Sequence, residues 1–236
     1  MMRQLILAAA RSERLKDASM RLGSVRSIVG RFVAGDEPED AVRTVRRLAE
    51  QGLRATVDHL GEDTTTPEAA IAAADANVDL LRRLADAGLA PVAEVSVKAS
   101  AIGQALPGGA ELSAELGHRI CATAREVGTT VTFDMEGHAT TDATLALVAA
   151  LRRTFPSTGA VLQAMLHRTT ADSAAWAVAG SRIRLCKGAY AEPASVAHTT
   201  APAIADAYRS CLALLVMGEG YPMIATHDPK MITASL

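Results

Sequence analysis

Late in the chain the sequence reads Arg182-Ile183-Arg184-Leu185-Cys186-Lys187-Gly188-Ala189-Tyr190. This is an apolar strand pattern that carries two arginines and a lysine into a glycine and then a phenol. A buried parallel strand is normally a nearly continuous run of Val, Ile and Leu. Arg184 and Lys187 on such a strand therefore require a polar interior, a bound anion or a catalytic site. A plainer interpretation places Arg182 and Arg184 on the solvent side of an edge strand.

On either side of this stretch the sequence repeats one unit, a strand pattern followed by a helix pattern. The other expected strands cover residues 55–60, 92–98, 130–136, 160–166 and 223–227. The expected helices cover residues 41–49, 66–84, 113–127, 141–153, 169–180 and 201–217, and one more begins at Pro229. Strict alternation of strand and helix, joined by right-handed crossovers, implies a parallel sheet with helices outside it.

Polar residues gather where these strands end, and their position separates two parallel-sheet architectures. A doubly wound sheet usually has a glycine-rich phosphate turn after its first strand, and Leu60-Gly61-Glu62-Asp63 is not of that type. In a (β/α)8 barrel the carboxyl ends of the strands converge on one active site. The residues concerned are Asp58, His59, Lys98, Asp134, Glu136, Gln163, Arg184, Lys187, Thr226 and His227. The predicted fold class is therefore α/β, a (β/α)8 TIM-type barrel.

The barrel predicted in this way is incomplete. Six strands can be counted, whereas closure needs eight, so the last two β/α units are expected to be missing. The predicted organisation is an N-terminal helical segment at residues 1–35 and a partial β/α barrel catalytic domain at residues 36–236. The first and sixth strands would expose sheet edges, which a partner or another packing would have to cover.

Composition narrows the class of protein. Apolar residues make up 49% and charged residues 21%, as in ordinary globular proteins, and a formal charge of -2 gives no electrostatic footprint for nucleic acid. The three cysteines have no C-x-x-C spacing, so neither a disulfide framework nor a metal site is expected. These features predict a cytoplasmic protein that binds small molecules, with peripheral contact at the inner face of the membrane left open.

Six runs of sequence, in this order, resemble the motifs of the proline dehydrogenase family, flavin-dependent (β/α)8 enzymes that oxidise L-proline. The runs are Thr56-Val57-Asp58-His59-Leu60-Gly61-Glu62, Ser96-Val97-Lys98-Ala99-Ser100, Phe133-Asp134-Met135-Glu136, Gln163-Ala164-Met165-Leu166-His167-Arg168, Arg184-Leu185-Cys186-Lys187-Gly188-Ala189-Tyr190 and Ala225-Thr226-His227. The resemblance extends from about residue 31 to the end of the chain, and six ordered motifs are far more specific than any one of them.

The resemblance implies a role for each of several residues. Lys98 and Asp134 would form a charge pair at the substrate face, Arg184 would contact the reactive edge of the flavin, and Asp134 and Arg184 would be catalytic. Lys98 and Tyr190 would bind substrate, and Glu62 would be one half of an ion-pair gate. The residues expected to hold the cofactor are Met135, Gln163, Lys187, Gly188, Ala189, Thr226 and His227.

The function implied by the resemblance is oxidation of L-proline to 1-pyrroline-5-carboxylate in proline catabolism, with hydride transfer to FAD. Electrons would pass on to a quinone-type acceptor, and a pyrroline-5-carboxylate dehydrogenase is an expected partner. The chemistry of the residues agrees, because a fixed guanidinium such as Arg184 stabilises negative charge that develops on a flavin ring. The family's paired arginines, which clamp the proline carboxylate, lie beyond the matching runs, so the chain as given is expected to bind proline poorly.

Other interpretations of the same residues stay open. Lys98 and Asp134 could be a structural pair, Gln163 could satisfy a neighbouring backbone group, and Met135 could be core filler. His227 could be an ordinary loop histidine. The chain could also be a non-catalytic truncated barrel that folds only as an oligomer or with a partner. A further alternative is a flavin-free barrel lyase with Lys98 as its Schiff-base nucleophile.

Overall fold

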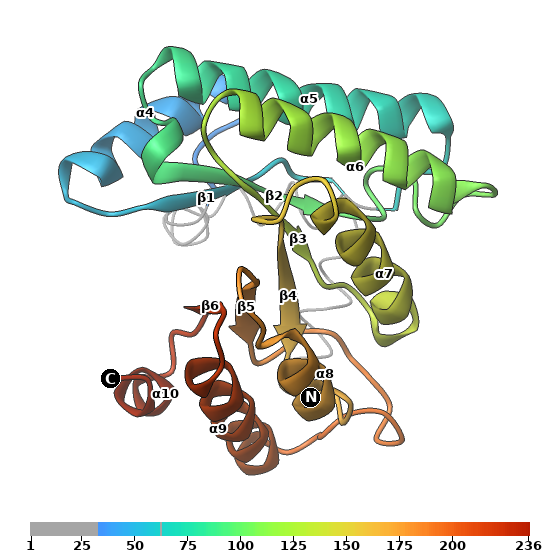
Figure 1. Ribbon diagram of the computed structural model, residues 1–236, viewed down its shortest axis with the longest axis vertical. Coiled ribbons are helices and arrows are strands. Elements are labelled where there is room, and N and C mark those ends of the chain that lie inside the picture. The colour runs from blue at the N-terminus through green and yellow to red at the C-terminus, as the bar shows by residue number, and fades with distance from the viewer. Residues whose placement is uncertain (1–32, 62) are drawn as a thin grey trace, which may run out of the picture.

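The computed structural model of the chain describes residues 33–61 and 63–236. The predicted helical segment at residues 1–35 thus lies almost wholly outside the described residues, as does Glu62. The described part is a six-stranded sheet whose strands alternate with helices (Figure 1).

All neighbouring strands of the sheet are parallel, and their order in space is their order in the chain. The strands are β1 (Ala55–Asp58), β2 (Ala93–Lys98), β3 (Val131–Asp134), β4 (Gly159–Gln163), β5 (Arg182–Cys186) and β6 (Tyr221–Ile224). A doubly wound sheet reverses its strand order part-way, and this sheet does not. The predicted barrel-type α/β fold is therefore confirmed.

Several predicted strands extend too far toward their carboxyl ends. The third strand ends at Asp134, the fourth at Gln163 and the sixth at Ile224. Met135, Thr226 and His227 consequently lie in the loops that follow the strands. Strand patterns cannot mark these ends, because residues after a strand often keep its apolar character while the chain already turns toward the next helix.

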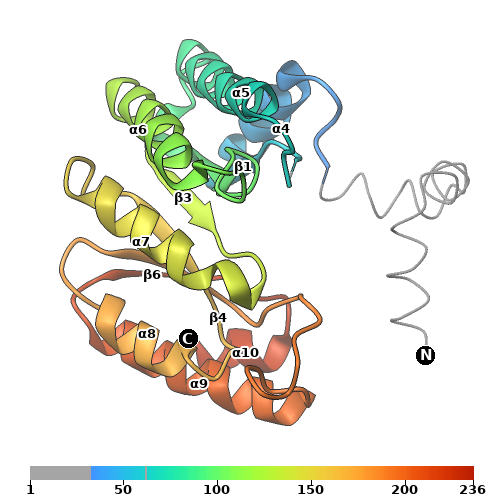
Figure 2. The ribbon, with the colours of Figure 1, turned by 90° about the vertical axis from the view of Figure 1, so that its right-hand side faces the viewer.

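Seven α-helices are described, and they lie in an arc around the outer side of the curled sheet. They are α4 (Pro38–Glu50), α5 (Pro67–Asp86), α6 (Gly109–Glu126), α7 (Thr141–Arg152), α8 (Thr169–Trp176), α9 (Ala201–Met217) and α10 (Pro229–Ala234). Helices α4 to α6 lie on one side of the curl and α8 to α10 on the opposite side, with α7 between them (Figures 1 and 2). Two short 3₁₀ turns, Ala90–Val92 and His138–Thr140, complete the connections.

Two of these helices begin in the way their sequences predict. The hydroxyl of Thr66 accepts a hydrogen bond from the backbone N–H of Ala69, and Thr200 accepts one from Ala203. Each threonine stands just before a helix with proline in its first turn, which is a favoured arrangement because proline has no N–H to leave unsatisfied.

The hydrophobic core lies between the sheet and the surrounding helices. Phe133 on β3, Val95 on β2 and Leu185 on β5 are fully buried and belong to one cluster with residues of the helices. The residues between them along each strand point the other way, into the curl of the sheet. This alternation makes the outer face apolar and the inner face polar, which is what positions the site described next.

Candidate functional site

Polar side chains from alternate strand positions line the inner face of the sheet. On β2 these are Glu94, Ser96 and Lys98, whereas the intervening Val95 and Val97 belong to the hydrophobic core. Because all six strands are parallel, their carboxyl ends lie at the same end of the sheet. Side chains at that end can therefore act on one ligand.

Lys98, the last residue of β2, forms an ion pair with Asp58, the last residue of β1. The distance from Lys98 Nζ to Asp58 Oδ2 is 2.7 Å, and the side chains are 18% and 30% exposed. On its other side Lys98 is aligned with Asp134 in the register of β2 and β3. The sequence predicts Lys98 and Asp134 as a pair, and the structure adds Asp58 as a close partner of Lys98.

Arg184 reaches from the middle of β5 across β4 to Asp134 on β3. Its Nη1 donates to Oδ1 of Asp134 at 2.8 Å and to Oγ of Ser96 at 3.3 Å. Its Nη2 is buried and has no hydrogen-bond acceptor among the described residues. Since β5 lies between β4 and β6, the interpretation that Arg182 and Arg184 face solvent on an edge strand is wrong.

Four charged side chains therefore alternate in sign around this end of the sheet. In the order of their strands they are Asp58, Lys98, Asp134 and Arg184. Their side chains are all partly buried, so their charges are screened less than those of surface residues. Such a row can bind a small molecule that carries both an ammonium group and a carboxylate.

A second layer of polar residues lies beneath this row, centred on Glu94. Its Oε2 accepts from Nη2 of Arg182 at 2.9 Å and from the hydroxyl of Thr130 at 2.7 Å. Its Oε1 accepts from the hydroxyls of Thr56 and Thr132, each at 3.1 Å. Sequence reasoning missed Glu94, although two steps of two residues back from Lys98 along the strand, past Ser96, would have found it.

Burial raises the pKa of the Asp58 carboxyl above its ordinary value of 3.8, and the hydrogen bond from Lys98 offsets this only in part. The folded protein thus holds this proton more tightly than the unfolded chain, so stability from Asp58 is present below 3.8 and is lost as pH rises through the raised pKa. We expect Asp58→Asn to gain stability relative to the unchanged protein as pH rises through that window. Urea unfolding at a series of pH values measures the difference, and a difference that shrinks with rising pH contradicts the prediction.

Two residues predicted to contact the cofactor are buried and already engaged with the protein. The side-chain Nε2 of Gln163 donates to the backbone carbonyl of Glu136 at 2.7 Å, and the backbone carbonyl of Gln163 accepts from the Thr169 hydroxyl at 2.6 Å. Met135 is 6% exposed and packs in the hydrophobic core. Gln163 thus satisfies a backbone group, as the alternative interpretation expected, and the cofactor contacts of both residues stay predictions.

Lys187, directly after β5, forms an ion pair with Asp228 in the loop after β6. The hydrogen bond from Lys187 lowers the pKa of the Asp228 carboxyl below its ordinary value. Thr226 supports this loop, because its hydroxyl accepts from the backbone N–H of Asp228 at 3.1 Å. The neighbouring His227 is exposed. Two of the residues predicted for cofactor binding, Lys187 and Thr226, are thereby brought together through Asp228, which sequence reasoning did not select.

The loop from Lys187 to Thr200 is fastened to the loops that follow β3 and β4. The backbone N–H of His138 donates to Glu192 Oε1 at 2.8 Å. The backbone N–H of His167 donates to the carbonyl of Val196 at 2.9 Å. These contacts hold the middle of the loop against the loops that follow β3 and β4. Ala189 and Tyr190 lie on its exposed side, and 37% of Tyr190 is accessible to solvent.

Gly188 has a positive φ of 100°, and a Cβ added there would lie 2.6 Å from Sδ of Met165. We expect Gly188→Ala to destabilise the fold by about 2 kcal/mol. The added methyl group strains the backbone at this positive φ and forces the Met165 side chain to move. Gly128→Ala is the matched control, since Gly128 also has a positive φ, of 83°, but no atom within 4 Å of the added Cβ. Chemical denaturation should show a larger loss for Gly188→Ala, and equal losses contradict the steric part of the prediction.

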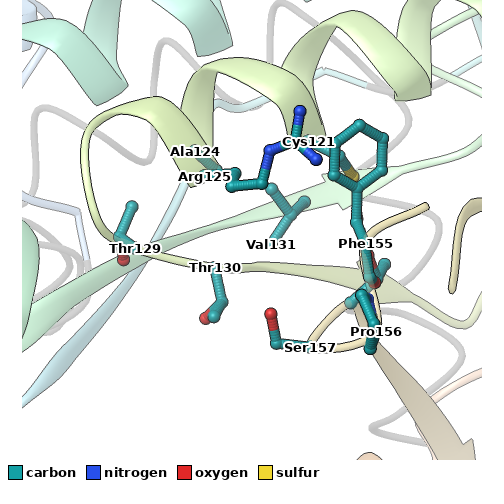
Figure 3. Close-up of a pocket in the computed structure, with 10 residues that line it drawn as sticks. Cys121, Ala124, Arg125, Thr129, Thr130, Val131, Phe155, Pro156 and Ser157 are labelled. Atoms are coloured by element: carbon teal, nitrogen blue, oxygen red, sulfur yellow. The ribbon is translucent and has the colours of Figure 1, made fainter.

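A cavity of about 140 Å³ lies at the opposite end of the sheet, between the end of α6 and the loop that precedes β4. Figure 3 shows the Arg125 guanidinium beside the Phe155 ring, and the distance from Arg125 Cζ to the ring centroid is 4.8 Å. None of the ten residues that line this cavity was predicted as a site residue. In barrel enzymes the active site lies at the carboxyl ends of the strands, so we place the candidate site there.

Within residues 33–61 and 63–236, no group of three or more His, Cys, Asp or Glu is arranged to hold a metal ion. None of the helices in this described part is long and apolar enough to cross a membrane. Glu62, the predicted half of an ion-pair gate, is not described. The next residue, Asp63, donates its backbone N–H to Oγ of Ser100 at 3.1 Å, so the loop after β1 lies against the loop after β2.

Comparison with known sequences identifies the relatives of this chain. Residues 41–235 match the family model described as proline dehydrogenase. The chain is 34% identical over 209 residues to proline dehydrogenase from Deinococcus radiodurans, an alignment that covers 87% of this chain and 67% of that protein. It is 32% identical to proline dehydrogenase 1 from Bacillus subtilis, with 98% of this chain and 75% of that protein covered.

Solved structures with the same fold include two proline utilization A (PutA) proteins. The match to PutA from Bdellovibrio bacteriovorus, inactivated by N-propargylglycine, has a TM-score of 0.80 at 21% identity and covers 89% of this chain. The match to a mutant of Bradyrhizobium japonicum PutA has a TM-score of 0.72 at 21% identity and covers 90% of this chain. The chain spans only 27% and 25% of those two longer proteins, and at this identity the likeness shows the fold alone.

Proposed function

Since this chain belongs to the proline dehydrogenase family, we propose that it oxidises L-proline to 1-pyrroline-5-carboxylate with FAD as its cofactor. The observation that carries the proposal is the row of alternating charges at the carboxyl ends of the strands. L-Proline is a small zwitterion, and the row offers it groups of both signs within one partly buried site. Proline loses a hydride from C5 and a proton from its nitrogen in this reaction, and bound FAD would supply the acceptor for the hydride.

Lys98 and Asp134 are the groups proposed to hold the substrate. The aligned positions of Lys98 and Asp134 on β2 and β3 set opposite charges side by side, which would orient the substrate carboxylate toward Lys98 and its nitrogen toward Asp134. The Asp134 carboxylate accepts a hydrogen bond from Arg184 at 2.8 Å, so it is fixed before substrate binds. Tyr190, near the start of the loop from Lys187 to Thr200, would contact the bound substrate.

Arg184 fits a flavin, because its buried Nη2 lacks a hydrogen-bond acceptor among the described residues. A guanidinium held at that position stabilises negative charge on an adjacent ring. The positive charge of Lys187 suits a diphosphate, and the positive φ of Gly188 lets the chain turn closely there. The other residues proposed to hold FAD are Met135, Gln163, Ala189, Thr226 and His227.

The alternative of a Schiff-base lyase is disfavoured by the environment of Lys98. A Schiff-base lysine must be neutral to attack a carbonyl group. The Nζ of Lys98 is instead engaged in an ion pair with the Asp58 carboxylate at 2.7 Å. We therefore assign Lys98 to substrate binding.

We further propose that electrons leave to a quinone-type acceptor and that the product passes to a pyrroline-5-carboxylate dehydrogenase. Contact with the inner face of a membrane would follow from a membrane-dissolved quinone. Measurement of reduction of a soluble quinone, with and without lipid vesicles, tests this part separately from the oxidation of proline.

The test of the proposed function is spectroscopic. Purified protein mixed with FAD without oxygen should show the flavin absorbance band, and L-proline should bleach it while D-proline leaves it unchanged. Protein that binds FAD but is not bleached by L-proline would overturn the assignment of substrate. Protein that binds no FAD would favour the non-catalytic alternative.

Replacing Asp228 with asparagine should strengthen the binding of FAD about threefold to tenfold, because the carboxylate competes with a diphosphate for Lys187. The gain is modest, since both side chains are about one-third exposed and water screens the pair. Asparagine is an equally good N-cap, so the contact of residue 228 with Lys230 N–H at the start of α10 is kept. Quenching of flavin fluorescence measures the affinity, Asp206→Asn on α9 controls for net charge, and weaker binding by Asp228→Asn contradicts the prediction.

A further inference from the structure

The polar layer under the candidate site contains one buried acid, Glu94, that no proposed role uses. It is only 7% exposed, and leaving a carboxylate inside a protein is costly unless its charge and oxygen atoms are matched. Three threonine hydroxyls and the Arg182 guanidinium donate to it. Its carboxylate is therefore held in one orientation by donors from β1, β3 and β5.

That orientation directs Oε1 of Glu94 toward Arg184. The distance from Oε1 to Nη2 of Arg184 is 3.8 Å, which is ion-pair range without a hydrogen bond. On its other side the guanidinium donates through Nη1 to Asp134 and Ser96. Arg184 thus lies between a carboxylate beneath it and a carboxylate at the rim.

Among the ion-paired side chains of β1, β2, β3 and β5, acids and bases are equal in number only when Glu94 is counted. The acids are Glu94, Asp134 and Asp58, and the bases are Arg182, Arg184 and Lys98. Without Glu94, the guanidinium groups of Arg182 and Arg184, which are two residues apart on β5, would lie in this partly buried site with no acid between them. Like charges in such a site repel strongly, so Arg184 would move toward the rim or lose its fixed orientation.

We propose that Glu94 is a positioning residue for Arg184. It fixes the guanidinium at the position where Arg184 would contact the flavin ring, and it sets the net charge beneath that ring. The inference rests on the proposed function for its effect on the flavin. The contact between Glu94 and Arg184 belongs to the chain alone and can be tested without any cofactor.

The test uses the full chain with Glu94→Gln, which keeps the size of the side chain and removes its charge. Glu94→Asp is the conservative variant, and Asp172→Asn is the matched control, because Asp172 pairs with Arg168 at 2.7 Å outside the barrel. Thr132→Val is a milder variant, since it keeps the charge of Glu94 and removes one hydrogen bond to Oε1. If Glu94→Gln does not fold, Thr132→Val takes its place in every comparison.

The cofactor-free measurement is the side-chain ¹⁵N spectrum of Arg184, assigned by its loss in Arg184→Lys. A guanidinium held on both sides rotates slowly and gives separate Nη signals. We expect these signals to merge in Glu94→Gln, to be retained in part in Glu94→Asp and to be unchanged in Asp172→Asn. Unchanged signals in Glu94→Gln would overturn the proposal even if its melting temperature fell.

The measurement with FAD bound follows the flavin midpoint potential and the kinetics of proline oxidation. Glu94→Gln should raise the potential, because an unbalanced cation favours the reduced flavin, and should lower kcat about tenfold with KM changed less than about twofold. A lower melting temperature with kcat and potential unchanged would overturn the proposal. If the unchanged protein neither binds FAD nor oxidises proline, the proposed function fails. The Arg184 spectrum still tests whether Glu94 holds Arg184 in place.

Discussion

Arg184→Met should lower kcat for proline oxidation by about 10³-fold, which is the largest effect expected of any single substitution in this chain. The guanidinium is the one cation proposed to lie against the flavin ring, and removing such a charge-stabilising donor costs about 10² to 10³ in rate. Its loss also leaves Asp134 without the hydrogen bond at 2.8 Å. Stopped-flow reduction of the bound flavin by L-proline measures the effect directly.

Two variants separate catalysis by Arg184 from a general effect of losing an arginine. Arg184→Lys keeps the positive charge and loses the planar fork that contacts Asp134 and Ser96 together, so its rate should lie between those of the unchanged protein and Arg184→Met. Arg168→Met removes an arginine that pairs with two acids outside the barrel and should leave kcat within about twofold. An Arg184→Met protein that keeps a tenth of the normal rate contradicts the assigned role.

Lys98→Met should raise KM for L-proline roughly 100-fold, with a smaller effect on kcat. The ammonium is proposed to bind the substrate carboxylate, and truncating one partner of a partly buried charge pair costs ~3 kcal/mol. The remaining Asp58 carboxylate, 30% exposed in the ion pair, would also repel the substrate carboxylate. Steady-state kinetics with the FAD-loaded protein gives both constants.

Lys98→Arg distinguishes proline oxidation from the lyase alternative. Arginine keeps the charge and can still pair with Asp58, so a substrate-binding role predicts partial recovery of KM. A Schiff-base nucleophile cannot be replaced by arginine, because its guanidinium stays protonated. Complete loss of activity in Lys98→Arg, together with trapping of a carbonyl compound on Lys98 by borohydride, would overturn the assignment of Lys98 to substrate binding.

The alternation of strands and helices could be predicted from sequence because it depends on local patterns. Strand patterns such as the one from Val92 to Val97 are short and lie between glycine or proline residues and helix caps, so each strand is recognisable alone. The spacing of two residues also fixes which side chains share a face. The sequence was enough to group Lys98 and Arg184 with the polar residues near the carboxyl ends of the strands, while strand ends such as that of β6 could not be located.

The amino-acid sequence by itself determined the parallel α/β fold, the polar inner face and the family motifs, since each depends on residues close together in the chain. Only the tertiary structure decided which charges meet: Lys98 with Asp58, Arg184 with Asp134, Lys187 with Asp228, and Glu94 beneath Arg184. The physical reason is that strand order, register and curl together select the partners. Arg184 reaches Asp134 over an intervening strand, at a separation of 50 residues along the chain, and no local pattern encodes that distance.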